Sequence, residues 1–328
     1  MKRREFITLL GGAAATWPLA ARAQQPAMPV IGFVNGRSAE DGARHGAAFR
    51  KGLEQTGYAE GQNVTLEYHW LDGRYDGLPS LIADLVRRRV AVIATPGFTP
   101  AALAAKAASP TIPIVFGVGE DPVKLGLVAS LARPGGNATG INFFINEILA
   151  KRLGLLHEMV PKAVRIAMLV NPANAPTTEA ALRDMPQAAH ALGLQTVVFN
   201  ASTSREIEAA FATLGREPAD ALLVGPDGFF LSRRMQFALL AMRHGIPMAQ
   251  FSRDGAEAGG LMSYGTDATD MFRQVGVMTG QILKGAKPAE LPVIQSTKFE
   301  FVINLVAARA LGLEVPPELS ARADEIIE

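Results

Sequence analysis

The chain has 328 residues, of which 48% are hydrophobic and 19% charged, with a formal net charge of +1 at pH 7. This length is typical of two domains, and a near-neutral charge without blocks of like charge argues against nucleic-acid binding. The chain contains no cysteine, which excludes disulfides, thiol nucleophiles, thiolate metal sites and a lipid anchor on cysteine.

The first 23 residues have the composition of an export signal. A basic start at residues 2–4 precedes the mostly apolar stretch 6–21, and Ala21-Arg22-Ala23 fits a cleavage site that leaves Gln24 as the mature start. Arg3-Arg4 also resembles a twin-arginine signal, and an ordinary secretory signal is the alternative. No later apolar run reaches the length of a membrane span. We therefore expect a soluble protein in the periplasm of a Gram-negative cell.

Strands and helices alternate in the first half of the chain. Apolar runs predict strands at residues 30–34, 64–70, 90–94 and 114–117, and helical periodicity predicts helices at 41–56, 78–89, 101–108 and 123–131. A turn cluster at residues 134–137 follows. Alternation of this kind is typical of a parallel sheet with helices on both faces.

The second half repeats this pattern. Strands are predicted at residues 165–170, 196–200, 221–224, 248–249, 261–264 and 299–303, and helices at 177–192, 206–214, 233–244, 269–283 and 305–311. Landmarks recur in order at a spacing of 130 to 136 residues: Asn35 and Asn171, Gly57 and Gly193, Pro96 and Pro226, Pro113 and Pro247. This spacing is the length of a domain, so we predict an α/β fold of two doubly wound parallel-sheet lobes joined by a hinge.

The lobes are expected to be discontinuous in sequence. A first crossover is predicted near residues 140–144 and a second break at 284–288. This assigns residues 28–140 to the first lobe, with about 266–290 returning to it, and residues 141–265 to the second. Whether about 298–328 returns to the second lobe is left open.

Ligands of doubly wound sheets lie beyond the carboxyl ends of the strands, which here are residues 35–38, 95–99, 118–121, 171–174, 225–229 and 251–253, with Tyr264 after a later strand. The candidate ligand-binding residues in these segments are Asn35, Ser38, Thr95, Phe98, Thr99, Asp121, Asn171, Asp227, Phe251 and Tyr264.

Several of these candidates have an equally simple structural role. Thr99 before Pro100 fits a helix N-cap, and Asp121 fits a cap for the predicted helix 123–131. Asp227, like the paired asparagines, could close a turn, and Tyr264 could pack in the core.

No catalytic or cofactor motif is found in the sequence. The five histidines lack metal-ligand spacing, and there is no Gly-x-Ser-x-Gly, phosphate loop or dinucleotide fingerprint. We therefore expect neither an enzyme nor a bound metal or cofactor, although catalytic triads are set by geometry and not by spacing.

Two long stretches resemble one family of ABC-transporter substrate-binding proteins, whose best known members bind tryptophan or tyrosine. They are GEDPV at residues 119–123 and GLVASLARPGGNATG at 126–140. Further likeness lies in AGGLMSYG (258–265), ILKGAKP (282–288), FVIN (301–304) and GQNV (61–64). The resemblance implies a type I periplasmic binding fold without catalysis, and it implies positions near the cleft for Asp121 and Tyr264.

The expected function is therefore capture of a small molecule, with an aromatic or apolar amino acid as the favoured ligand. Hinge closure of the lobes would hold the ligand for an inner-membrane ABC permease with its ATPase. The protein is expected to be a monomer. A sensory module of the same fold, presenting ligand to a membrane receptor, is the first alternative, and a secreted enzyme on a two-lobe fold is the second.

Overall fold

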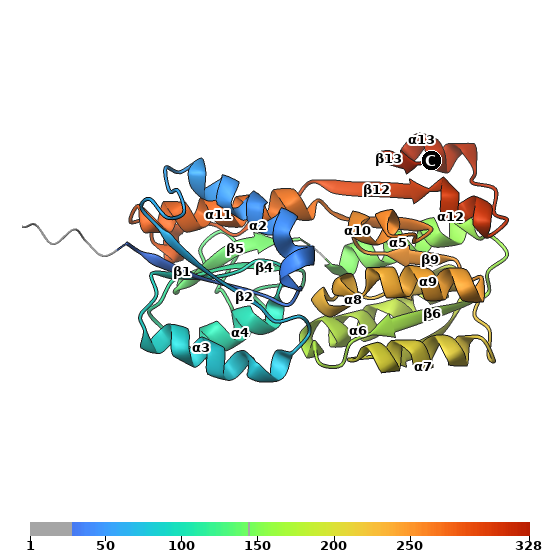
Figure 1. Ribbon diagram of the computed structural model, residues 1–328, viewed down its shortest axis with the longest axis horizontal. Helices are drawn as coiled ribbons and strands as arrows, with labels where there is room; N and C mark the ends of the chain where they lie inside the picture. Colours follow the sequence, from blue (N-terminus) through green and yellow to red (C-terminus); the bar gives the residue numbers. More distant parts are fainter. Residues whose placement is uncertain (1–27, 144) are drawn as a thin grey trace, which may run out of the picture.

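The computed structural model describes residues 28–143 and 145–328, so the predicted export signal lies outside the described residues. The described chain forms two lobes that lie side by side along the long axis of the molecule (Figure 1). Each lobe has a central sheet covered by helices on both faces, and the predicted α/β fold is confirmed. Among the described residues, none of the helices has the length and apolar character that crossing a membrane requires.

The first lobe is built on a parallel sheet of six strands. These are β1 (Val30–Asn35), β2 (Thr65–Trp70), β3 (Val92–Thr95), β4 (Ile114–Val118), β5 (Ala138–Asn142) and β11 (Ile294–Gln295), in the spatial order β11-β5-β4-β3-β1-β2. Helices α2 (Ala39–Glu54) and α11 (Ala268–Leu283) cover one face, and α3 (Leu78–Arg87) and α4 (Thr99–Ala108) cover the other (Figure 1). Short 3-10 turns are η1 (Tyr75–Gly77) and η2 (Pro288–Glu290).

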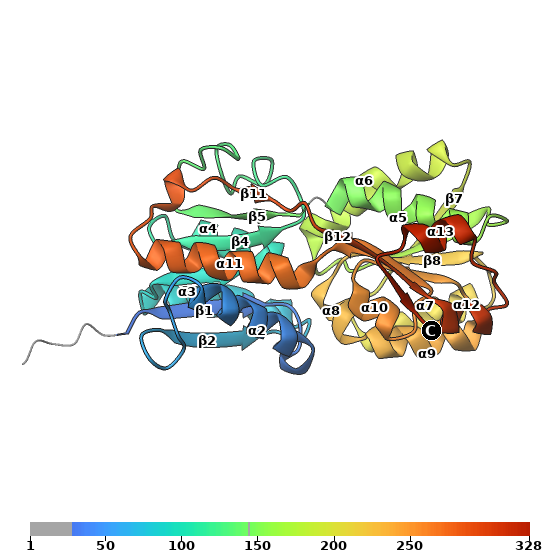
Figure 2. The same ribbon diagram turned by 90° about the horizontal axis from the view of Figure 1, so that it is seen from above.

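The second lobe is built on a sheet of seven strands. These are β6 (Arg165–Val170), β7 (Gln195–Asn200), β8 (Ala221–Val224), β9 (Met248–Gln250), β10 (Met262–Thr266), β12 (Phe299–Asn304) and β13 (Glu325–Ile327), in the order β13-β12-β10-β9-β8-β6-β7. Helices α5 (Ile145–Met159), α6 (Ala175–Ala191) and α13 (Pro317–Arg322) lie on one side (Figure 2). The opposite side carries α7 (Ser204–Leu214), α8 (Gly228–Ser232), α9 (Arg234–His244), α10 (Arg253–Glu257) and α12 (Leu305–Ala310).

One strand departs from the predicted parallel sheets. β12 pairs antiparallel with β10, and Thr266 lies opposite Phe299 in this register. The reason is the path of the chain: β10 leaves the second lobe at Thr266, and β12 enters it again at the same edge. Two neighbouring strands that leave and enter at one point must run in opposite directions.

Three segments connect the lobes. The chain crosses between β5 and α5, between β10 and α11, and between β11 and β12. The backbone N–H of Asp267 donates to the carbonyl of Lys298 at 3.0 Å, and the hydroxyl of Thr266 donates to the carbonyl of Phe143 at 3.1 Å. The three crossings therefore lie beside one another and form a single narrow connection.

The return of α11 to the first lobe is made possible by glycine. A Cβ on Gly52 of α2 would lie 2.0 Å from the carbonyl oxygen of Arg273, and a Cβ on Gly276 of α11 would lie 2.1 Å from that of Phe49. Both clashes would be with backbone, so only glycine permits this approach of the two helices. The close contact fixes α11 on α2, over a core that includes Phe33, Phe49 and Phe272.

The predicted helix at residues 123–131 is wrong. This segment forms turns, with hydrogen bonds from Leu125 N–H to Asp121 and from Gly126 N–H to Val123, both at 3.0 Å. Gly126 has a φ of 71°, which lies in the left-handed region and ends helical geometry. The apolar side chains that suggested helical periodicity, Leu127 and Val128, are buried in the core of the first lobe.

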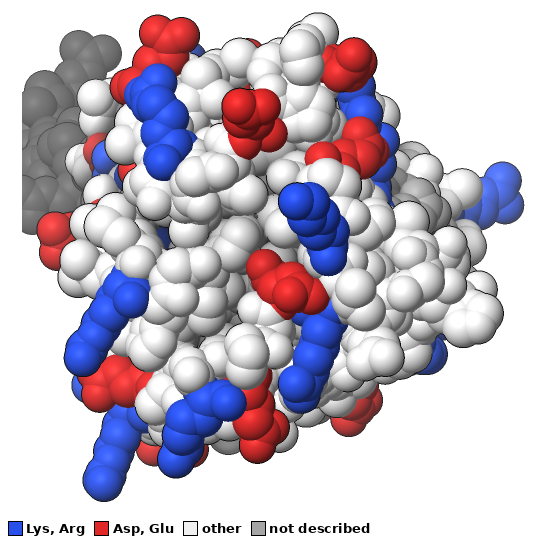
Figure 3. All heavy atoms as spheres, turned by 90° about the vertical axis from the view of Figure 1, so that its right-hand side faces the viewer, with Lys and Arg blue, Asp and Glu red and all other residues white. Residues whose placement is uncertain are grey.

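The outer end of the second lobe has a mixed charge. Lys and Arg side chains are interspersed there with Asp and Glu (Figure 3).

Candidate functional site

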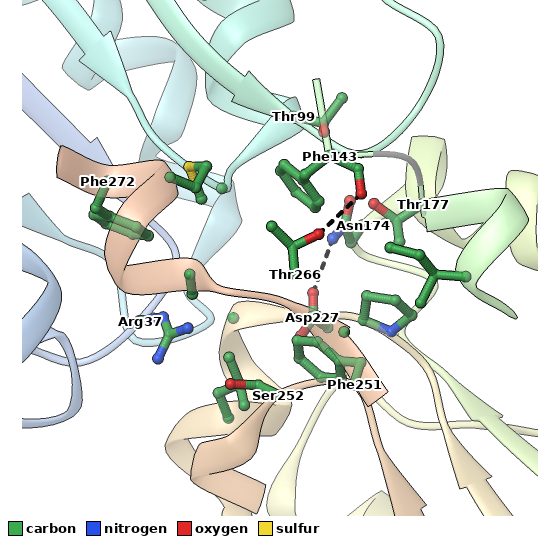
Figure 4. Close-up of a pocket in the computed structure, with 18 of the residues that line it drawn as sticks. Arg37, Thr99, Phe143, Asn174, Thr177, Asp227, Phe251, Ser252, Thr266 and Phe272 are labelled. Carbon is green, nitrogen blue, oxygen red and sulfur yellow. Dashed lines mark hydrogen bonds between the residues drawn. The ribbon is translucent and has the colours of Figure 1, made fainter. Parts of the chain in front are cut away.

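A cavity lies between the two lobes, at the carboxyl ends of strands from both sheets. Its volume is about 800 Å³, counting the space that opens to solvent. Loops of the first lobe, the hinge, and the starts of α5, α6 and α8 all contribute to the wall (Figure 4). The apolar part of the wall includes Phe143, Leu231, Phe251, Met271 and Phe272.

Three of the residues named from the sequence line this cavity: Thr99, Asp227 and Phe251. Thr99 begins α4 in the first lobe, Asp227 precedes α8 in the second, and Phe251 follows β9. The rule that ligands lie beyond strand ends therefore brings residues from both lobes to one space.

Asp227 is buried and fully engaged by donors. Its Oδ1 accepts from the side-chain nitrogen of Asn171 at 2.9 Å and from the N–H groups of Phe229 and Phe230, so it caps α8. Its Oδ2 accepts from Asn174 at 3.0 Å and from the hydroxyl of Tyr75, across the lobes, at 3.1 Å. Burial raises the pKa of Asp227, while these donors favour the carboxylate and act in the opposite direction. The side chain organises the cavity wall.

The candidate residues Asn35, Ser38 and Asn171 lie behind the cavity wall and hold its loops. The side chain of Asn35 donates to the carbonyl of Pro96 at 2.6 Å and accepts from the N–H of Arg37 at 3.0 Å. Ser38 caps α2, and its N–H donates to the Ser232 hydroxyl of the other lobe at 2.9 Å. Asn171 supports Asp227.

Four further candidates are not brought to the cavity wall. Thr95 and Phe98 are buried in the first lobe, where the Phe98 ring packs 4.9 Å from that of Tyr75. Asp121 is exposed and accepts from the N–H of Val123 at 2.9 Å, which makes it the cap of a turn. The ring of Tyr264 stacks on Phe299 at 6.3 Å.

Arg152, in the middle of α5, lines the cavity and was not found from the sequence. Only 2% of its surface is exposed, and its Nε donates to the carbonyl of Tyr264 at 2.8 Å. Its Nη1 is buried without an acceptor among the described residues. Burial lowers the pKa of Arg152 to about 9. The sequence contained a sign of this role, because Arg152 is a charged residue on the apolar helix face that carries Leu149, Leu153 and Leu156.

A second missed residue, Glu120, joins the lobes beside the cavity. Its carboxylate accepts from the hydroxyl of Thr99 at 2.7 Å and from the hydroxyl of Thr177, in the other lobe, at 2.6 Å. Glu120 is 5% exposed. The strand-end segment 118–121 contained it, but the neighbouring Asp121 was the predicted site residue because the family resemblance implies a position near the cleft for it.

Ion pairs connect the lobes along one rim. Asp254 accepts from Arg37 at 3.0 Å and from Arg44 at 2.5 Å, and Arg234 pairs with Asp41. Burial lowers the pKa of Arg37, and Asp254 opposes this effect. At the same rim the backbones nearly touch, since a Cβ on Gly228 would lie 3.0 Å from the backbone of Gly36. The lobes are therefore in contact, with complementary charges across the boundary.

Buried His45 belongs to this rim as well. Burial and the positive charge of Arg37 lower its pKa to about 3, although Asp254 lies 4.0 Å from its Nε2. Neither ring nitrogen has a hydrogen-bond partner among the described residues, so His45 is neutral at pH 7. Within the described residues, no cluster of His, Asp or Glu has the arrangement of a metal site.

Known proteins match nearly the whole described chain. Residues 28–327 match the family described as ABC transporter substrate binding protein. A tyrosine-binding protein of Clostridioides difficile (strain R20291) is 27% identical over 266 residues, which are 81% of this chain and 76% of that protein.

Solved structures show the same fold. An ABC domain from Streptococcus pneumoniae in complex with L-Trp has a TM-score of 0.82 at 24% identity, covering 91% of this chain and 99% of that one. The ligand-free, open structure of CD0873, a substrate-binding protein from Clostridium difficile, has a TM-score of 0.63 at 24% identity, covering 92% and 99%. The resemblance seen in the sequence is confirmed, and the chain belongs to the family of ABC transporter substrate-binding proteins, which is a family of binding proteins and not a class of enzymes.

Proposed function

We propose that this protein is the periplasmic component of an ABC importer and that it captures a small organic molecule by closing its two lobes around it. The observation that carries the proposal is the cavity between the lobes, which has side chains of both lobes in its wall. Membership of the substrate-binding family supports it. The closed complex would then be recognised by an inner-membrane permease with its ATPase.

An aromatic or apolar amino acid remains the favoured ligand. The names of two relatives, a tyrosine-binding protein and a domain in complex with L-Trp, support this choice. So does the wall of the cavity, where Phe143, Phe251 and Phe272 offer aromatic faces (Figure 4). We propose Thr99, Asn174 and Thr177 as polar ligand contacts together with Arg152, while Asp227 positions Asn174.

Closure about the hinge follows from the way the lobes meet. The contacts between them, such as Arg37 with Asp254 and Tyr75 with Asp227, are polar pairs that water can replace when the lobes separate. Three short crossings that lie together can bend without disturbing either sheet. A ligand favours closure only by the difference between its affinities for the two forms, so it must touch both lobes. That a relative is known in a ligand-free, open form supports this mechanism.

Export and monomeric state belong to the same proposal. A mature start at Gln24 would be checked by the intact mass of protein recovered from the periplasm, and retention of residues 1–23 would contradict it.

The alternative function is a sensory module that presents the ligand to a membrane receptor. Loss of ligand uptake in a strain lacking the protein would favour transport, and loss of a ligand response with normal uptake would favour sensing.

The direct test is a thermal-shift screen of the mature protein against amino acids, aromatic acids and small carboxylates. A ligand at 100 times its Kd adds about 2.7 kcal/mol to the free energy of unfolding, which raises Tm by roughly 5–10 °C. X-ray scattering should then show a smaller radius of gyration with the bound ligand. A flat response to a broad library would reject a binding function, and binding without compaction would reject hinge closure.

A further inference from the structure

The strongest unexplained feature of the cavity is the charge of Arg152. Its guanidinium is buried, and its one hydrogen bond within the described residues is from Nε to the carbonyl of Tyr264. No described carboxylate contributes to its electrostatic environment. A buried cation without a counter-charge is costly and is rare in folded proteins. Because this side chain lines the cavity, a ligand carboxylate can supply the missing partner through the forked geometry that arginine prefers.

The cavity also presents hydrogen-bond acceptors that lack donors. We call Thr99, Asn174 and Thr177 the acceptor set. Both threonine hydroxyls donate their protons to Glu120, so their remaining lone pairs are what they can offer to the cavity. The side-chain nitrogen of Asn174 donates to Asp227, and its Oδ1 is buried without a partner. Figure 4 shows the acceptor set around one region of the cavity.

The charges behind the acceptor set are negative. Glu120 and Asp227 are buried carboxylates that fix the orientation of its members. An ammonium group has three N–H donors and no acceptor, which complements three neutral oxygens in the field of two carboxylates. A ligand hydroxyl would fill only one of these positions.

We propose, building on the function above, that the cavity binds an α-amino acid through two separate poles. Arg152 pairs with the carboxylate, and the acceptor set holds the α-ammonium group. Glu120 is a positioning residue that acts through the two threonines. Thr99 comes from the first lobe and Thr177 from the second, so the ammonium site is complete only when the lobes are closed. Recognition of the ammonium group is thereby coupled to closure.

Titration calorimetry of the mature protein with matched ligands tests the proposal. The twenty L-amino acids are the first probes, and the tightest of them is compared with its des-amino acid and its decarboxylated amine. The amino acid is expected to bind at least about tenfold more tightly than either analogue, because each analogue leaves a charged or polar group unpaired. Equal binding of the des-amino acid would overturn the ammonium site, and equal binding of the amine would overturn the role of Arg152.

Failure of this inference can be told from failure of the proposed function. If no L-amino acid binds but another compound of a broad library does, the two-pole site is wrong and the binding function stands. If no compound binds at all, the proposed function itself fails.

Variants provide the second arm of the test. Thr177→Val should lower the preference for the amino acid over its des-amino acid by about tenfold. Thr178→Val is the matched control on the same helix, because that hydroxyl donates to the carbonyl of Asn171 and does not line the cavity. Arg152→Met should abolish the preference for the amino acid over the amine, and Arg152→Lys should restore part of it. Each preference is a ratio within one variant, so partial unfolding cancels. Unchanged ratios in Thr177→Val and Arg152→Met would refute the proposal.

Discussion

Asp254→Asn should weaken ligand binding by impairing closure. In this structure, where the lobes are in contact, Asp254 is 13% exposed and neutralises Arg37, whose side chain is 7% exposed and lies 3.0 Å away across the lobes. Removing one partner of a buried ion pair costs about 3–5 kcal/mol. Because Arg44 also contacts Asp254 and is 45% exposed, water reaches this pair. We therefore expect the substitution to cost about 2–3 kcal/mol of the free energy that favours closure.

This cost falls on closure and not on folding, because Arg37 regains water when the lobes separate. Each 1.4 kcal/mol is a factor of about ten, so the closing equilibrium should shift by roughly 30- to 150-fold. The apparent Kd of any closing ligand should rise by the same factor. Calorimetry gives the Kd, and the melting temperature of the ligand-free protein should change little.

Glu257→Gln is the matched control. Its carboxylate lies 3.9 Å from Arg44 and its side chain is 40% exposed. The binding free energy should therefore change by less than about 1 kcal/mol, as is usual for exposed ion pairs. An Asp254→Asn protein that binds as tightly as the parent would refute the role of this pair in closure. If Asp254→Asn lowers the free energy of unfolding equally with and without ligand, Asp254 stabilises one lobe and not the contact between the lobes.

Gly228→Ala should reduce ligand affinity at least about tenfold, because the new Cβ would lie 3.0 Å from the backbone of Gly36 and 3.2 Å from that of Arg37. Titration calorimetry measures this affinity, and an unchanged Kd would contradict closure of the lobes at this contact. His45 has a folded pKa of about 3 against about 6.5 unfolded, so stability should be full above pH 6.5 and fall as the pH drops toward 3, by up to about 1.4 kcal/mol per pH unit. Denaturation of His45→Gln at several pH values should lose this slope, and an identical slope in both proteins would contradict its assignment to His45. Asp121→Ala should leave the Kd of the ligand unchanged and lower the free energy of unfolding by less than about 1 kcal/mol, as expected of an exposed turn cap. Loss of ligand binding in this variant would show that Asp121 belongs to the binding site.

The two-lobe fold could be predicted because the chain repeats its landmarks. Strand ends at Asn35 and Asn171 occupy equivalent places, and alternating strands and helices allow few topologies. The antiparallel β12 could not be predicted in the same way, because its direction depends on where the hinge returns the chain and not on its own residues. The turns at 123–131 were misread because apolar spacing fits a helix equally well, and only the left-handed Gly126 excludes one.

The candidate site was predictable to the level of segments. Strand ends identified Thr99, Asp227 and Phe251, since the carboxyl edge of a parallel sheet is fixed by topology. Which side chain of a segment faces the ligand depends on loop geometry, which separated Glu120 from Asp121 and turned them in different directions. Arg152 lies on a helix, where periodicity identifies an apolar face but not whether a cavity or a packed core lies beneath it.

The opposing charges of the closed form explain how a ligand could control its own capture. The ion pair of Arg37 with Asp254 favours contact between the lobes, whereas the empty cavity provides no counter-charge for the buried guanidinium of Arg152. Burial lowers the pKa of Arg152 to about 9, so an unpaired guanidinium destabilises a cavity that excludes water. A ligand carboxylate removes that penalty and leaves the favourable pair intact. Closure then depends on ligand charge, because a neutral molecule of the same shape would fill the cavity and leave Arg152 unpaired.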